Sequence, residues 1–145
     1  RAGRTDNRGR ALIQTYQPEH PVVEAILRGD DDDFWVSEAK QREIASMPPF
    51  GKLVGIIISS SNLERAMSTA NQLKDNTQAL DIIGARVYGP APAPIARIKR
   101  RHRIRFLIKS PRTPGLQDAV RKWVATVSLK GDLRLSIDID PQSFY

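Results

Sequence analysis

The sequence contains no cysteine and only two histidines, His20 and His102. The lack of cysteine excludes disulfides and thiolate metal sites, and two isolated histidines do not supply the ligand set of a zinc centre. Four consecutive acids occupy residues 30–33, but on a helix they would point around its axis rather than converge on an ion. We therefore expect this chain to hold no metal and no other cofactor.

Long apolar runs and catalytic pairs are also missing. The longest apolar stretch, LVGIIIS at 53–59, is far shorter than the roughly 20 residues of a membrane helix. No signal-peptide pattern opens the chain, so we expect a soluble, cytoplasmic monomer with no membrane partner. No nucleophile with a base and no pair of catalytic acids is evident, which disfavours an autonomous enzyme and predicts no catalytic residue.

Charge is plentiful but unevenly distributed within a formal net charge of +7. Residues 1–48 hold seven Lys/Arg against nine Asp/Glu, a net of −2, whereas residues 49–145 hold sixteen against seven, a net of +9. Pro48-Pro49 separates the two parts, because proline ends a helix and restricts the residue before it. We predict two domains, 1–48 and 49–145, of which the second attracts polyanions such as nucleic acid.

The hydrophobic patterns of the second part predict an α+β fold. An apolar run at 52–59 predicts a buried strand, and Ser61-x-x-Glu64 predicts a capping box at the start of an amphipathic helix. Further strands are expected at 84–88, 95–100, 103–109 and 133–140, with a second helix from Thr113. We predict a ferredoxin-like split β-α-β sandwich, of order β-α-β-β-α-β, with both helices on one sheet face.

Eight of the sixteen cations of the second part lie between Arg97 and Arg112. Strand alternation directs Ile104 and Phe106 toward the helices and the intervening arginines outward, and we expect Arg97 and Lys99 to extend this basic face. Three interpretations remain open. The cluster can bind phosphate backbones, it can bind an acidic peptide, or it can be an edge hairpin charged against aggregation.

Aromatic residues are too few among these cations to favour base stacking. Phe106 alone interleaves with them, and alternation places it on the core side. The segment GPAPAP at 89–94 is expected to be irregular, because its prolines lack ladder donors; it offsets two strands or docks against a neighbour. Arg112, in SPRTPG, lies beside a helix start where an anion can bind, although the same prolines also simply end a strand and start a helix.

Several motifs together resemble a known family. RAGRTDNRGR at 1–10 is similar to the last motif of superfamily 2 helicases, and IQTYQPEHP follows it at 13–21. Glu38-x-x-x-Arg42, PPFG at 48–51, GPAPAPI at 89–95 and DIDP at 138–141 complete the pattern. In this order they resemble the carboxy-terminal region of the primosomal replication-restart DNA helicases, the PriA family, across essentially the whole chain.

The resemblance implies a carboxy-terminal fragment of an ATP-dependent 3′-to-5′ helicase that restarts stalled forks and assembles the primosome. Residues 1–48 would be the remnant of its second RecA-like lobe. In this part the residue patterns themselves predict helices within 17–29 and 30–46 and a short strand at 11–16. Arg1 and Arg4 would reach the γ-phosphate of ATP in the parent, which also uses magnesium and zinc. The phosphate loop GxxxxGK[ST] is missing, so the fragment alone would not hydrolyse ATP.

The family's partners would be branched and single-stranded DNA, the acidic tail of single-stranded DNA-binding protein, and other primosome proteins. By this analogy, together with charge and alternation, we assign the acidic tail to Lys109 or Arg112. The alternative function is an RNA-binding or protein-docking module without a catalytic role. The residues assigned to DNA phosphates are Arg97, Lys99, Arg100, Arg101, Arg103 and Arg105.

Overall fold

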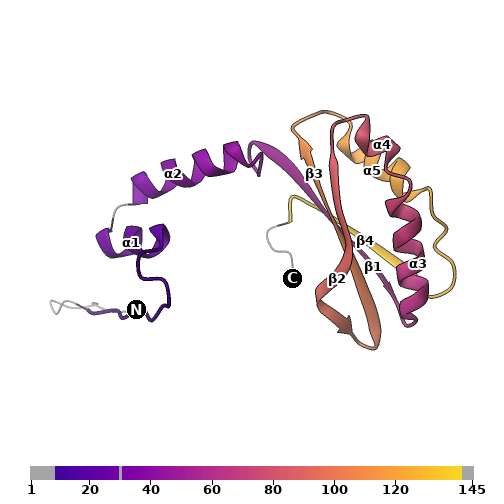
Figure 1. Ribbon diagram of the computed structural model, residues 1–145, viewed down its shortest axis with the longest axis horizontal. Helices are drawn as coiled ribbons and strands as arrows, with labels where there is room; N and C mark the ends of the chain where they lie inside the picture. The colour runs from indigo at the N-terminus through magenta and orange to yellow at the C-terminus, as the bar shows by residue number, and fades with distance from the viewer. Residues whose placement is uncertain (1–8, 30, 142–145) are drawn as a thin grey trace. The chain divides into compact units, whose positions relative to one another are not determined.

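The computed structural model describes residues 9–29 and 31–141, and the chain divides into two compact units, 1–40 and 41–145. Figure 1 shows the helices and strands of both units. Within the described residues, no helix is long and apolar enough to cross a bilayer. We describe each unit by itself.

The first unit contains α1 (Pro21–Arg28) and most of α2 (Asp31–Ile44), and both predicted helices are confirmed. The His20 side chain accepts a hydrogen bond from the backbone N–H of Val22 at 3.3 Å and caps α1. The strand predicted at 11–16 is wrong: these residues adopt no regular structure. Leu12 and Tyr16 are fully exposed, and a strand forms only with a partner, which the described part of this unit does not supply.

The second unit is an α+β sandwich, as predicted. Its strands are β1 (Gly51–Ser60), β2 (Arg86–Ile98), β3 (Arg101–Pro111) and β4 (Arg134–Ile139), and they form an antiparallel sheet in the order β2-β3-β1-β4. This order is that of a split β-α-β fold. The helices α3 (Leu63–Lys74), α4 (Gln78–Asp81) and α5 (Leu116–Val124) cover one face (Figure 1).

The core lies between that face and the helices, and Trp123 of α5 is its largest buried side chain. Its ring meets Phe106 of β3 edge to face, with 5.4 Å between centroids. The indole N–H donates to the carbonyl of Leu73 at 2.8 Å, which ties α5 to the end of α3. Ile104, Phe106 and Ile108 are buried, so the predicted alternation of β3 is confirmed.

The proline segment departs from the sequence-based expectation. The strands predicted at 84–88 and 95–100 are one continuous strand, β2, which runs through GPAPAP. A strand with three prolines is tolerated because β2 lies at the sheet edge and its pairing with β3 is interrupted between Tyr88 and Ala91 and again between Pro92 and Arg97. The prolines therefore produce irregular pairing within a strand, rather than a break between two strands.

The predicted capping box of α3 is also wrong. The N-cap is Asn62, whose side-chain oxygen accepts from the backbone N–H of Arg65 at 3.0 Å. Ser61 instead donates its backbone N–H to Asp132 at 2.6 Å. Ser61, predicted from the local pattern to cap α3, is thus bound by Asp132, a carboxylate distant in sequence.

Candidate functional site

The sheet face turned away from the helices, here called the outer face, displays most of the sheet's cations. Residues directly opposite on neighbouring antiparallel strands point to the same side, so the pairing register defines the face. It consists of Arg86, Tyr88, Ala91 and Ile98 of β2; Arg101, Arg103, Arg105, Leu107 and Lys109 of β3; Leu53, Gly55, Ile57 and Ser59 of β1; and Arg134, Ser136 and Asp138 of β4.

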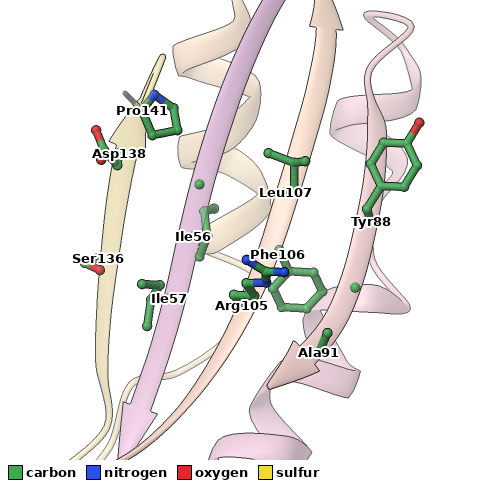
Figure 2. Close-up of a pocket in the computed structure, with 12 residues that line it drawn as sticks. Ile56, Ile57, Tyr88, Ala91, Arg105, Phe106, Leu107, Ser136, Asp138 and Pro141 are labelled. Atoms are coloured by element: carbon green, nitrogen blue, oxygen red, sulfur yellow. The ribbon is translucent and has the colours of Figure 1, made fainter. Parts of the chain in front are cut away.

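A hollow of about 450 Å³ occupies the middle of this face (Figure 2). Its floor is apolar: Leu107 lies opposite the unsubstituted Gly55 on the neighbouring strand, and Ile57 lies two residues further along β1. Figure 2 shows Tyr88 and Asp138 on opposite sides of the hollow, with Arg105 between them. We call this cavity the outer-face hollow.

Tyr88 is held beside the hollow by a local break in the β2 ladder. Its partner is Leu107, and pairing resumes only at Ala91. Gly89 between them has φ = +112°, and a Cβ there would lie 2.8 Å from the carbonyl oxygen of Arg105, so only glycine fits. The bulge leaves Tyr88 48 % exposed beside the basic strand.

The structure places Arg103, Arg105 and Lys109 on the outer face, half-buried along β3. Arg103 donates to the carbonyl of Ile95 at 3.2 Å, which fixes its side chain against β2. Within the described residues, Arg86, Arg103 and Lys109 form no ion pair. These cations therefore add uncompensated positive charge to the face.

Arg97 does not extend the outer face as predicted. It lies opposite His102, which shares the side of Ile104 rather than that of Arg103. The irregular pairing of β2 shifts the alternation, so Ile98 and not Arg97 joins the side of the arginines. Arg97 is nevertheless exposed, near the end of the hairpin.

Lys99 and Arg100 form the two-residue turn between β2 and β3, where Ile98 pairs with Arg101. Both are exposed, with φ of +48° and +62°. Positive φ at both central positions is the conformation of a type I′ turn, which favours Asn-Gly. These two cations project from the hairpin tip rather than from the sheet, so the prediction that Lys99 extends the basic sheet face is wrong.

Arg101 is engaged inside the molecule. Its guanidinium lies 3.5 Å from the carboxylate of Asp132 and donates to the carbonyls of Ser59, at 2.8 Å, and of Asp132. Asp132 also accepts from the Ser60 hydroxyl at 2.8 Å. The backbone N–H of Ser61, followed by the hydroxyls of Ser61 and Ser60, holds the pKa of Asp132 well below its ordinary value, against a smaller opposing effect of burial.

Lys109 and Arg112, assigned to an acidic partner, lie at the end of β3 and just after it. Lys109 pairs in register with Arg86 and with Leu53. Close by, Asp140 accepts from the Lys52 ammonium at 2.6 Å and from the Leu53 N–H at 3.0 Å. Burial alone would raise the pKa of Asp140, but these donors, with help from the charge of Arg112, lower it.

The remaining predicted positions carry no site in the described residues. Arg1 and Arg4, assigned to the nucleotide of the parent, lie outside the part of the chain that the structure describes. Within residues 9–29 and 31–141, no group of three potential metal ligands converges.

Sequence reasoning missed Arg86 and Tyr88. The signal was the alternation of Arg86, Val87 and Tyr88, which places the first and third on one side of a strand. They are far from the arginine cluster in sequence, and only the register brings them beside Lys109 and Leu107.

Comparison with known proteins identifies the family. Residues 43–142 match the family model described as the primosomal protein N C-terminal domain. The chain belongs to this family. Over its whole length it is 31% identical to the replication restart protein PriA of Rickettsia conorii, of which it covers 22%. It is 36% identical to the PriA of Synechocystis over 99% of the chain, and 29% identical to that of Bacillus subtilis over 97%.

The match to the primosomal protein N C-terminal domain therefore covers nearly all of the second unit, including the end of α2. The chain spans about a fifth of the length of these relatives, covering 22%, 17% and 18% of them. The outer face, the outer-face hollow and the hairpin turn all lie within the matched residues.

Proposed function

We propose that this chain is the carboxy-terminal DNA-binding and partner-binding part of an ATP-dependent 3′-to-5′ helicase that restarts replication at stalled forks. It binds branched DNA through the outer face and the hairpin turn. The relatives are replication restart proteins, and a basic sheet face suits the phosphate backbones of a fork. Hydrolysis of ATP then belongs to the part of the parent that carries the phosphate loop.

One observation carries the proposal: the outer face holds Arg86, Arg103 and Lys109 without an ion pair in the described residues, while all three helices of this unit lie on the other side. Like charges on neighbouring strands repel, so their side-by-side placement lowers stability. An anion that bridges them relieves this repulsion.

The hairpin turn supports the same conclusion. Lys99 and Arg100 adopt left-handed backbone conformations that disfavour non-glycine residues by roughly 1–2 kcal/mol each. Strained residues that persist at an exposed turn point to a role in binding. Two cations at a hairpin tip can reach a DNA groove or a second arm of the fork.

The test is a titration of fluorescent fork DNA with the variant Arg103→Glu/Arg105→Glu. We expect the dissociation constant to rise roughly 10-fold or more, because two contacts become repulsive. The matched control is Arg121→Glu/Lys122→Glu, which makes the same change of net charge on α5, on the other side of the sheet. Equal weakening in both variants would show that only net charge matters and would count against an outer-face site.

We propose a second role for Lys109 and Arg112 in binding the acidic tail of single-stranded DNA-binding protein. Both cations lie at one end of β3, away from the hairpin turn. An acidic peptide ending in phenylalanine should bind the wild type and bind Lys109→Glu/Arg112→Glu at least about 10-fold more weakly. Tighter binding of an RNA hairpin than of fork DNA would instead favour the RNA-binding alternative.

A further inference from the structure

The outer-face hollow lies within a row of four residues that crosses the whole sheet. Asp138, Gly55, Leu107 and Tyr88 are consecutive partners from β4 to β2. With strands about 4.8 Å apart, the row spans roughly 14 Å between its outer backbones. Gly55 contributes no side chain and Leu107 a shorter one than Tyr88, so the row is lowest at Gly55 and rises toward Tyr88. This shape is a slot with one aromatic wall.

The aromatic wall is Tyr88. Its side chain is half exposed, although a tyrosine normally buries much of its ring, and the bulge at Gly89 fixes the backbone that carries it. The floor of Ile57 and Leu107 is apolar. A flat, uncharged ring fits between such a wall and floor better than a sugar or a phosphate does.

Cations lie on both sides of the slot along the strand direction. The row before it contains Lys109 and Arg86, and the rows after it contain Arg105 and then Arg103. A ligand that places a ring in the slot therefore meets positive charge at both of its ends. A nucleotide within a single strand has this form, because its base is flanked by a phosphate on each side.

Asp138 distinguishes a nucleobase from the aromatic end of an acidic peptide. Its carboxylate lines the slot opposite Tyr88 (Figure 2), with Ser136 on the same strand. The carboxylate repels the anionic groups of an acidic peptide and of DNA alike, so the distinction rests on hydrogen bonding. Toward a base it accepts hydrogen bonds from the exocyclic amino groups of cytosine, adenine or guanine, whereas thymine has no such donor.

We propose that the outer-face hollow binds one unpaired nucleobase of the DNA, stacked on Tyr88 and with its amino group donating to Asp138. This inference rests on the proposed DNA binding and deepens it, because it adds a subsite for an unpaired base to a surface that otherwise recognises backbone. The hollow, at about 450 Å³, falls within the roughly 300–1,000 Å³ of small-molecule pockets.

The test compares two fork substrates, one fully paired at the junction and one with a single unpaired 2-aminopurine there. The wild type should bind the second fork more tightly and quench its fluorescence by stacking. Tyr88→Leu should weaken binding of the second fork by about 10-fold and remove the quenching, while the fully paired fork binds as before. Tyr88→Trp should restore both, because tryptophan retains a stacking surface.

A second variant blocks the slot from its floor. A Cβ at Gly55 has its nearest atoms at 3.8 Å, on Pro141, and at 4.0 Å, on Asp138, so Gly55→Val should fit the strand and fill the hollow. It should remove the preference for the unpaired base while thermal unfolding remains cooperative. Asp138→Asn should reduce the preference for single-stranded dC over dT.

Several outcomes would overturn the inference. Equal effects of Tyr88→Leu on both forks, or no effect on either, would exclude a base-binding slot. Displacement of the 2-aminopurine fork by an acidic, phenylalanine-ending peptide, in wild type but not in Tyr88→Leu, would assign the slot to a peptide instead. If Arg103→Glu/Arg105→Glu abolishes fork binding while Tyr88→Leu changes the binding of neither fork, the proposed function stands and only the base-binding subsite is excluded.

Discussion

Asp132 is the residue on which the second unit's polar contacts converge. It accepts from Ser60 and Ser61 and lies 3.5 Å from Arg101 and 3.8 Å from Arg65, so it links the turn before α3 to the loop before β4. Replacing one carboxylate oxygen by an NH2 group removes the charge that Arg101 faces while it preserves the shape. Asp132→Asn should therefore lower the thermal midpoint.

The same residue predicts a pH dependence. Because the folded pKa of Asp132 is below its unfolded value of about 3.9, its stabilisation is complete above that value and is lost as the pH falls toward the folded pKa. Urea unfolding of wild type and Asp132→Asn should show a difference at pH 7 that narrows progressively below pH of about 4. A difference that stays constant down to pH 3 would contradict this prediction.

Arg101 and Arg103 show how neighbouring residues of one cluster diverge. Both were assigned to DNA phosphates by analogy with the family, together with charge. Arg101 is 21% exposed in its side chain and donates to Ser59 and Asp132, whereas Arg103 forms no ion pair within the described residues. The assignments of Arg101 and Arg103 to DNA phosphates both remain predictions. The structure makes Arg103 the sharper residue to test, because its replacement breaks no ion pair among the described residues, whereas replacement of Arg101 removes its contact with Asp132.

At the scale of single elements, we expect changes in the β2–β3 turn to affect stability and DNA binding in opposite directions. Replacing Lys99 and Arg100 by Asn and Gly supplies the residues that a type I′ turn favours. Lys99→Asn/Arg100→Gly should raise the free energy of unfolding by about 1 kcal/mol. The same variant should bind fork DNA more weakly, since it removes two cations.

Urea unfolding and fork titration on the same preparation measure whether the free energy of unfolding rises while the affinity for fork DNA falls. A matched control is Lys130→Asn with its neighbour Gly131 unchanged, which creates an Asn-Gly pair at a loop outside the sheet. Weaker binding together with lower stability would indicate that the turn residues serve folding, and would remove their support for a DNA-binding role.

The strands also show what sequence patterns establish and where they fail. The alternation of β3 correctly placed Ile104 and Phe106 in the core, because a regular ladder on both sides preserves a period of two. In β2 the same reasoning misplaced Arg97, because bulges at the prolines reset the alternation. Tyr88 was missed for a related reason: its neighbours in space come from β3, and only the register supplies them.

At the scale of the molecule, the two parts differ in how they bury apolar surface. The second unit has a core that joins β1 and β3 to the helices. In the first unit α1 has no buried residue, and Leu12, Leu27 and Trp35 are exposed. Such surface normally lies against a partner. The relatives that the chain matches are about five times as long.

At the scale of the molecule, the positive charge of the second part predicts that its affinity for DNA falls with salt concentration. The sixteen cations and seven acids of residues 49–145 give a net charge of +9, and cations on the outer face release counterions when they meet phosphates. Arg103→Gln should reduce the slope of log affinity against log salt concentration by about 1 in fork titrations between about 50 and 200 mM salt. Lys122→Gln removes the same charge from α5, on the other side of the sheet, and should leave the slope unchanged. Long-range attraction would lower the slope equally for Arg103 and Lys122, and only contact with the DNA makes the two variants differ. An equal fall in both slopes would therefore count against DNA bound on the outer face.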